Sequence, residues 1–150
     1  MNTDKIEKRT VLKAPIGRVW RAISRPQEFG AWFRVALEGE FVEGTPIRGR
    51  ITYPGYEHLT AELFIETIRA PTYFAFRWHP HATEPNTDYS DEPTTLVEFE
   101  LEEVAGGTQL TVHESGFDRI PEARRSLALR MNDQGWASQL QNVEEYVARN

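Results

Sequence analysis

Residues 121–150, PEARRSLALRMNDQGWASQLQNVEEYVARN, predict one long amphipathic helix at the end of the chain, and this helix decides the fold. Apolar residues recur there at spacings of three, four and seven, which places them on one face of a helix. The members of this stripe are Leu129, Trp136, Leu140, Val143 and Val147. A helix with one apolar stripe needs a second layer against which to bury it.

A polar pair interrupts the stripe. Asn132 and Asp133 fall on the same face, and burying either side chain without a partner costs a few kcal/mol. The pair therefore predicts a wet or ligand-filled region under the middle of the helix, unless helix curvature carries both side chains to a solvated rim. Gly135 costs about 1 kcal/mol relative to alanine inside a helix. We expect a strand or a ring to approach it closely, the alternative being a slight bend.

The second layer is predicted from the middle of the chain, where the hydrophobic period changes to two. Turn residues divide residues 33–115 into six strands, and a further strand covers Ile6 to Leu12. The six strands are expected at about 34–41, 47–53, 59–68, 73–79, 95–104 and 108–114. Because short turns join them, the seven strands should form an antiparallel sheet.

Alternation within the strands assigns the two faces of this sheet. Phe74, Phe76 and Trp78 share one side of their strand, and the next strand is apolar on one side and acidic on the other. The apolar positions of that strand are Val97, Phe99 and Leu101, and the acidic ones are Glu98, Glu100 and Glu102. A sheet with one apolar face needs a cover, and the long terminal helix is the element large enough to supply it.

Two short helices are expected after the first strand. Pro15 suits the first turn of a helix that continues through Val19 and Ile23 and stops at Pro26, and a second runs from Gln27 to about Trp32. Residues 1–150 are thus predicted to form a single α+β domain of strand, two short helices, six strands and one long helix.

One connection is longer than the others. Pro80 to Pro93 contains three prolines and four acidic residues and is predicted to be a loop, either a lid or binding loop or a surface insertion. His79 and His81 flank Pro80, but a catalytic zinc site needs about three protein ligands, and no further residue stands at a recognisable spacing. We therefore expect no metal.

The amino-acid composition excludes several classes of partner and chemistry. The net charge of −6 comes from 17 Lys and Arg against 23 Asp and Glu, which argues against nucleic acid or an anionic membrane as a partner. The absence of cysteine excludes disulfides, thiolate metal sites and cysteine nucleophiles. No phosphate loop, nucleophile elbow or dinucleotide fingerprint occurs, so no cofactor is expected. Residues 1–9 are polar, no run is long enough to span a bilayer, and a cytoplasmic protein is expected.

Several stretches together resemble one superfamily. They are APIGRVWRAI at 14–23, WF at 32–33, FAFRW at 74–78, GTQLTVHESGF at 107–117, and GW at 135–136 with Leu140 and Val143. In order and spacing they resemble the START-like (SRPBCC) helix-grip superfamily, in particular the branch named after the activator of heat-shock-protein ATPase. The resemblance implies a curved seven-stranded sheet wrapped around the long helix, with an interior cavity. The superfamily includes lipid carriers, hormone receptors, polyketide aromatases and cyclases, and co-chaperone domains.

Glu114 is the one catalytic candidate, at a position where the branch often has a histidine. Counting by twos from Leu110 places it on the dry side of its strand, where apolar surroundings would raise its pKa and suit it to proton transfer. Alternatively the strand end is open to water, and Glu114 caps a turn or pairs with Arg119 or Arg124.

Trp78 and Trp136 stand on the two layers that should face each other, one on the dry face of the sheet and one on the helix. A buried indole N–H needs a hydrogen-bond partner. We expect Asn132, Asp133 or a bound polar group to provide it.

The predicted function is binding of a small, mostly apolar molecule in a cavity between sheet and helix, as a carrier or sensor without an assigned reaction. The expected ligand-binding residues are Trp32, Tyr53, Leu63, Phe76, Trp78, Phe99, Glu114, Asn132 and Trp136. One alternative is a cyclase- or aromatase-like enzyme in which Glu114 acts as acid or base and Asn132 holds an oxygen. Another is a chaperone-interacting module. A homodimer is also left open.

Overall fold

The computed structural model describes residues 4–84 and 87–149. Its elements, in chain order, are β1 (Lys5–Leu12), α1 (Ile16–Ser24), α2 (Pro26–Phe33), β2 (Val35–Leu37), β3 (Pro46–Ile51), β4 (Thr60–Arg69), β5 (Tyr73–Trp78), β6 (Thr95–Val104), β7 (Gly107–Ser115), a short 3₁₀ helix η1 (Phe117–Arg119) and α3 (Glu122–Arg149). All strand pairs are antiparallel, in the order β1-β7-β6-β5-β4-β3-β2. Except for η1, this is the predicted order of elements.

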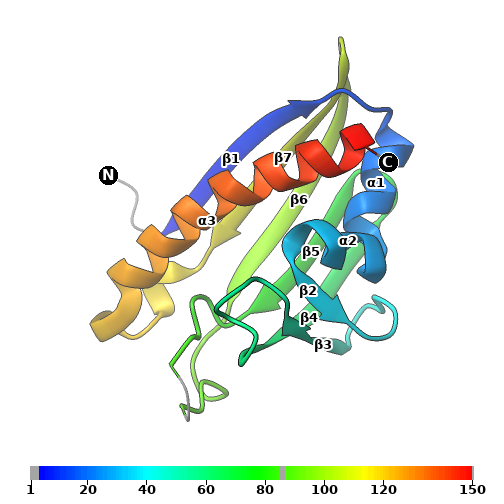
Figure 1. Cartoon of the computed structure of the whole chain (residues 1–150). Helices are drawn as coiled ribbons and strands as arrows, with labels where there is room; N and C mark the ends of the chain where they lie inside the picture. Colours follow the sequence, from blue (N-terminus) through cyan, green and yellow to red (C-terminus); the bar gives the residue numbers. More distant parts are fainter. Residues whose placement is uncertain (1–3, 85–86, 150) are drawn as a thin grey trace.

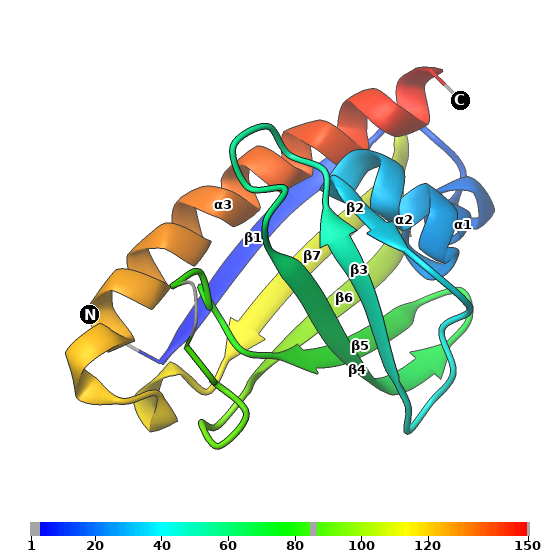
Figure 2. The same ribbon diagram turned by 60° about the horizontal axis from the view of Figure 1, so that its bottom comes forward.

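The long helix α3 lies across one face of the sheet, as Figure 1 shows. In Figure 2 the sheet curves around the helix, and α1 and α2 lie near the carboxyl end of α3. Burying the apolar stripe of α3 against the sheet stabilises both layers. Its buried residues are Ala128, Trp136, Leu140, Val143 and Val147, while Leu129 is only partly buried. The predicted α+β helix-grip architecture is confirmed.

The strand expected at 34–41 is much shorter in the structure, which corrects that prediction. β2 contains only three residues, Val35–Leu37. Before it, Arg34 adopts a left-handed conformation with φ 73° and donates its backbone N–H to Gly30 O, ending α2. After it, Gly39 has φ 106° and turns the chain away from the sheet. Local backbone conformations at both ends therefore prevent a longer strand.

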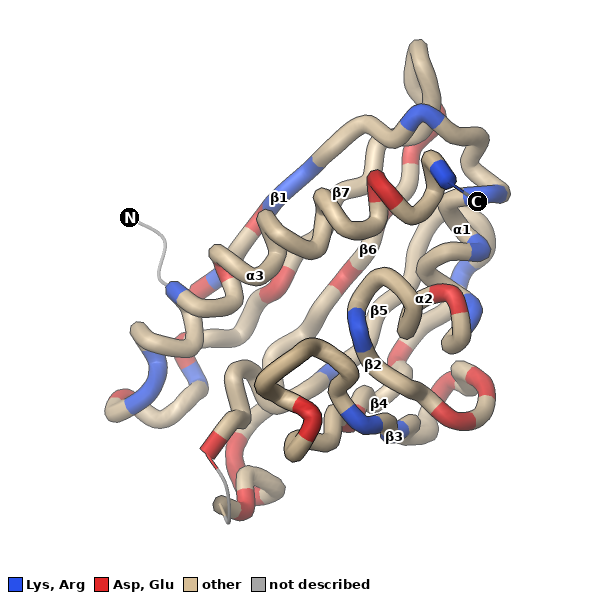
Figure 3. Tube along the Cα trace, viewed as in Figure 1, with Lys and Arg blue, Asp and Glu red and all other residues tan. Residues whose placement is uncertain are grey.

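Charged residues of both signs are interspersed along the chain, as Figure 3 shows. Within residues 4–84 and 87–149, no helix combines the length and the apolar character needed to cross a bilayer.

The pairing of β2 with β3 depends on a glycine. Gly49 lies opposite Leu37, and a Cβ atom added to Gly49 would lie 2.3 Å from the carbonyl oxygen of Ala36. No side-chain rearrangement relieves that overlap, because the obstructing atoms belong to the backbone. Gly17, on the exposed face of α1, has nothing within 4 Å of the same added atom.

We therefore expect Gly49→Ala to lower the free energy of unfolding by about 1–3 kcal/mol, the usual cost of inserting a methyl group into a filled space. Gly17→Ala is the matched control and should not destabilise the protein, because it adds a methyl group in open space and favours the helix. Urea denaturation of the three proteins measures the difference. Equal stability of the two variants would contradict the close packing of β2 on β3.

Candidate functional site

The site is organised around one carboxylate that is removed from solvent. Glu114 is 0% exposed, on β7, between Ile6 of β1 and Val97 of β6. Its side chain points to the same side as those of Leu110 and Val112, as the period of two predicted. The alternative expectation, a strand end open to water, is wrong.

Four side chains donate hydrogen bonds to this carboxylate. Oε1 accepts from Trp136 Nε1 at 2.8 Å and from Asn132 Nδ2 at 3.0 Å. Oε2 accepts from Trp78 Nε1 at 2.7 Å, from Thr95 Oγ1 at 2.5 Å and again from Asn132 Nδ2 at 3.1 Å. The donors come from β5, from the start of β6 and from α3. The carboxylate therefore connects the sheet to the helix that covers it.

None of these donors carries a charge, and within the described chain no Lys or Arg forms an ion pair with Glu114. The expected pairing of Glu114 with Arg119 or Arg124 is wrong, since Arg124 pairs with Glu92 instead. Burial raises the pKa of Glu114, and the hydrogen bonds from Thr95 and the other donors act in the opposite direction.

The chemistry of the donors restricts where Glu114 can hold a proton. An indole N–H and an amide NH₂ only donate, so Trp78, Trp136 and Asn132 all favour the ionised carboxylate. The Thr95 hydroxyl can also accept, and it contacts Oε2. When Glu114 is protonated, the proton therefore has one partner in this group of four, and it sits on Oε2 facing Thr95.

A small, mainly apolar groove lies beside this network. Its volume is about 90 Å³, and its lining residues are Phe33, Trp78, Asn132, Gly135, Trp136 and Gln139. The ring centroids of Trp78 and Trp136 are 5.8 Å apart, and that of Phe33 lies 5.8 Å from Trp78 and 6.1 Å from Trp136. Three of the lining residues are donors to Glu114. The carboxylate thus lies behind the groove wall rather than on its surface.

Gly135 keeps the groove open. The expectation that a strand or a ring approaches this glycine closely is wrong, because a Cβ atom there would have nothing within 4 Å. A side chain at this helix position would instead extend into the groove that Gly135 lines. Glycine lowers the helix propensity of α3 at a position that borders the groove, and not at a position where another element packs closely against the helix.

The two polar residues of the helix stripe, Asn132 and Asp133, lie in different environments. Asn132 points inward and binds Glu114, whereas the side chain of Asp133 is 51% exposed and forms an ion pair with Lys8 on β1 at 3.2 Å. The prediction that both share the inward face is therefore wrong for Asp133. The partner that both indole N–H groups find is Glu114, not Asn132 or Asp133 as expected.

The structure brings together four of the predicted ligand-binding residues: Trp78, Asn132 and Trp136 line the groove, and Glu114 lies behind it. The predicted residues Trp32, Leu63, Phe76 and Phe99 are at most 3% exposed and pack in the core. Tyr53 is 52% exposed and contacts Tyr56, at a centroid distance of 5.7 Å.

Sequence reasoning missed Phe33, Gln139 and Thr95. Phe33 ends α2, and the hydrogen bond from Gln139 Nε2 to its carbonyl oxygen, 3.2 Å long, holds α2 against α3. Thr95 begins β6. The WF pair at 32–33 was a signal for Phe33, whereas a threonine at a strand start carries no signal for a buried acceptor.

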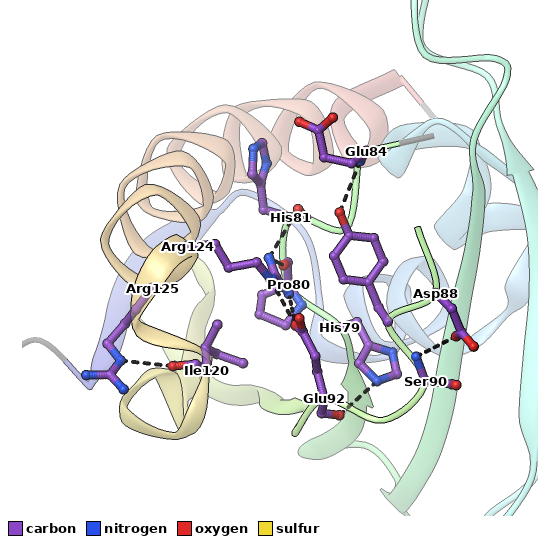
Figure 4. Close-up of polar contacts among 11 residues, drawn as sticks. His79, Pro80, His81, Glu84, Asp88, Ser90, Glu92, Ile120, Arg124 and Arg125 are labelled. Atoms are coloured by element: carbon purple, nitrogen blue, oxygen red, sulfur yellow. Dashed lines mark hydrogen bonds and ion pairs between the residues drawn. The ribbon is translucent and has the colours of Figure 1, made fainter. Parts of the chain in front are cut away.

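The long loop after β5 is attached to α3 by one arginine (Figure 4). Arg124 forms an ion pair with Glu92 at 2.7 Å and donates from Nη1 to the Pro80 carbonyl oxygen at 2.8 Å. Its guanidinium group lies over the ring of Tyr89, 4.8 Å from the centroid. The described part of the loop therefore rests on the start of α3, while Pro85 and Asn86 lie outside the described residues. A lid role stays a prediction.

His79 and His81 do not converge on a metal site. The Nε2 atom of His79 lies 3.1 Å from the Glu92 carbonyl oxygen, and burial lowers the pKa of His81. Among the residues that the structure describes, no three His, Asp or Glu side chains gather as metal ligands would.

A curved antiparallel sheet closed by a long helix, with a groove at their junction, defines a START-like (SRPBCC) helix-grip protein. Residues 13–148 match the family model described as activator of Hsp90 ATPase homolog 1-like protein. The chain belongs to this family. A search of the curated proteins found no match.

Solved structures show the same fold at low sequence identity. A protein from Mesorhizobium loti is 18% identical with a TM-score of 0.75, over 97% of this chain and 98% of that one. The Aha1 dimer from Colwellia psychrerythraea is 18% identical with a TM-score of 0.71, over 95% of each chain. DynU16, a protein of the dynemicin biosynthetic locus, is 20% identical with a TM-score of 0.74, over 97% of this chain but 47% of its own.

The raised pKa of Glu114 makes stability depend on pH. Between the ordinary value of 4.5 and the folded pKa, the folded protein binds the proton more strongly than the unfolded chain does. The contribution of this group to the free energy of unfolding should therefore fall as pH rises through that interval. A ¹³C NMR titration of the carboxyl group should give a midpoint above 4.5. A midpoint at or below that value would contradict burial as the dominant influence.

Each donor to the carboxylate should contribute to stability. Trp78→Phe removes one indole N–H and should lower the free energy of unfolding by about 1–3 kcal/mol near neutral pH and raise the pKa of Glu114 further. The control is Trp32→Phe, which removes a different indole hydrogen bond, to Ala22 O at 2.8 Å. That variant should lose stability but leave the titration midpoint of Glu114 in place. An unchanged titration midpoint of Glu114 in Trp78→Phe would contradict the conclusion that the hydrogen bond from Trp78 lowers the pKa of this carboxyl group.

Proposed function

We propose that this protein binds a small, mostly apolar ligand in the groove between α2, β5 and α3. The observation that carries the proposal is an apolar opening lined by Phe33, Trp78 and Trp136 at the junction of sheet and helix. Concave aromatic surfaces with a few fixed polar groups are typical of small-molecule sites. The hydrogen bonds to Glu114 hold two of the three aromatic side chains in place before a ligand arrives, which lowers the entropic cost of binding.

The size of the groove limits what enters it. A volume of about 90 Å³ is well below the roughly 300–1,000 Å³ of pockets that enclose a drug-sized molecule. One compact group of the ligand therefore occupies the groove, and the rest of the ligand lies outside it.

The geometry favours binding over catalysis. A general acid or base must reach the proton that it transfers, directly or through one water. Glu114 is fully buried, is not part of the groove lining, and accepts hydrogen bonds at both oxygens. The amide of Asn132 is directed at the same carboxylate. A carrier or sensor therefore fits better than the cyclase-like alternative.

Two other partners remain predictions. The family name and the dimeric relative from Colwellia psychrerythraea are the support for a chaperone contact and for a homodimer. No groove or contact of the described residues favours either one over ligand binding.

Binding can be tested with tert-butylbenzene, a compact apolar probe, followed by the indole N–H signals of Trp78 and Trp136 in ¹⁵N NMR spectra. Both signals should shift on titration of the wild type. Gly135→Leu should abolish the shifts, because the new side chain extends into the groove, while the protein remains folded since leucine favours the helix. Gln134→Leu places the same side chain on an exposed neighbouring position of α3 and should bind like the wild type.

The absence of any shift in the wild type would overturn the proposal. Equal shifts in wild type and Gly135→Leu would place the probe elsewhere on the protein and would overturn it as well.

A further inference from the structure

The groove has an unusual electrostatic character for an apolar site. Its wall contains three aromatic rings, from Phe33, Trp78 and Trp136, whose centroids lie 5.8 to 6.1 Å from one another. The faces of aromatic rings carry negative potential, so a cation placed against them is attracted, most strongly by tryptophan.

Both tryptophans direct their indole N–H groups at the same carboxylate. Nε1 of Trp78 and Nε1 of Trp136 lie 2.7 and 2.8 Å from oxygens of Glu114. Donation to a carboxylate draws electron density toward the rest of the indole, because hydrogen-bonded groups polarise one another. The ring faces of both indoles are therefore more negative than those of an isolated indole, and the two rings stack on each other where they line the groove.

The carboxylate itself adds to this field. Its four hydrogen-bond donors are neutral, and Arg124 pairs with Glu92 and Lys8 with Asp133. The guanidinium group of Arg119 lies beside Gly116, but this residue is exposed, so water screens its charge. Glu114 lies one indole side chain away from the groove and is buried, so water screens its charge little. An ionised Glu114 therefore contributes negative potential to the groove.

We propose that the compact group held in this groove is a small organic cation, a methylated or alkyl ammonium attached to an apolar body. This inference rests on the ligand-binding function proposed above and names the class of ligand. A methylated ammonium is compact and outwardly apolar, and aromatic cages bind such groups. A carboxylate or phosphate on the ligand would be repelled by Glu114, and an uncharged group would gain nothing from its charge.

The proposal couples binding to the protonation of Glu114. A cation in the groove stabilises the ionised carboxylate, so it lowers the pKa of Glu114, and by linkage its affinity falls when Glu114 takes up a proton. An uncharged ligand of the same shape has no such coupling. No ionisable side chain lines the groove itself, whose lining residues are aromatic, amide or glycine.

The test compares phenyltrimethylammonium with tert-butylbenzene. The two compounds have nearly the same shape, but the first carries one positive charge and the second is neutral. The indole N–H signals of Trp78 and Trp136 report both titrations. The cation should bind at least about ten-fold more tightly well above the titration midpoint of Glu114, and this preference should shrink as pH falls through the midpoint. In Glu114→Gln the preference for the cation should be smaller than in the wild type at high pH and should no longer change with pH, because only the rings remain to attract the cation. Should that variant fail to fold, the wild-type pH profile decides alone.

The outcomes separate the two proposals. Equal or tighter binding of tert-butylbenzene in the wild type overturns the cation inference and leaves the apolar binding groove intact. A preference for the cation that does not change with pH also overturns it. Absence of any effect of either compound on the indole signals overturns both. Cation binding that persists in Gly135→Leu places the cation outside the groove and overturns the inference.

Discussion

The structure depends on one buried carboxylate that is satisfied by neutral donors. Glu114 on β7 accepts hydrogen bonds from β5, β6 and α3, and its burial would be strongly unfavourable without them. A carboxylate with several directional donors also has fewer acceptable arrangements than an apolar contact, since each donor must meet a lone pair. The position of α3 on the sheet is therefore specified by these bonds as well as by its apolar stripe.

Stability and binding share the same side chains. Trp78, Asn132 and Trp136 satisfy the carboxylate on one side and line the groove on the other. The network fixes their rotamers, and this rigidity is what a binding site needs from the residues that support it. Gly135 contributes in the opposite manner, by leaving space where any larger residue would fill the groove. A helix built for stability alone would have alanine there.

Much of the fold could be predicted because its signals are local. The period of two in β5, β6 and β7 and the stripe on α3 identified the layers and their facing sides, and the same counting placed Glu114 on the dry face. The length of β2 could not be predicted, since it depends on the left-handed Arg34 and the turn at Gly39. The stripe likewise could not separate Asn132 from Asp133, because only the position of β1 makes Lys8 available to Asp133.

The sequence by itself determined the seven strands, the covering helix, the buried side of Glu114 and the absence of thiol chemistry, because periodicity and composition act over neighbouring residues. Only the tertiary structure decided which groups satisfy the carboxylate and where the groove lies. The donors stand 18 to 36 residues from Glu114 along the chain, and sequence spacing says nothing about which of them meet. The sheet curvature and the docking of α3 bring them within hydrogen-bond distance, and those are properties of the packed layers.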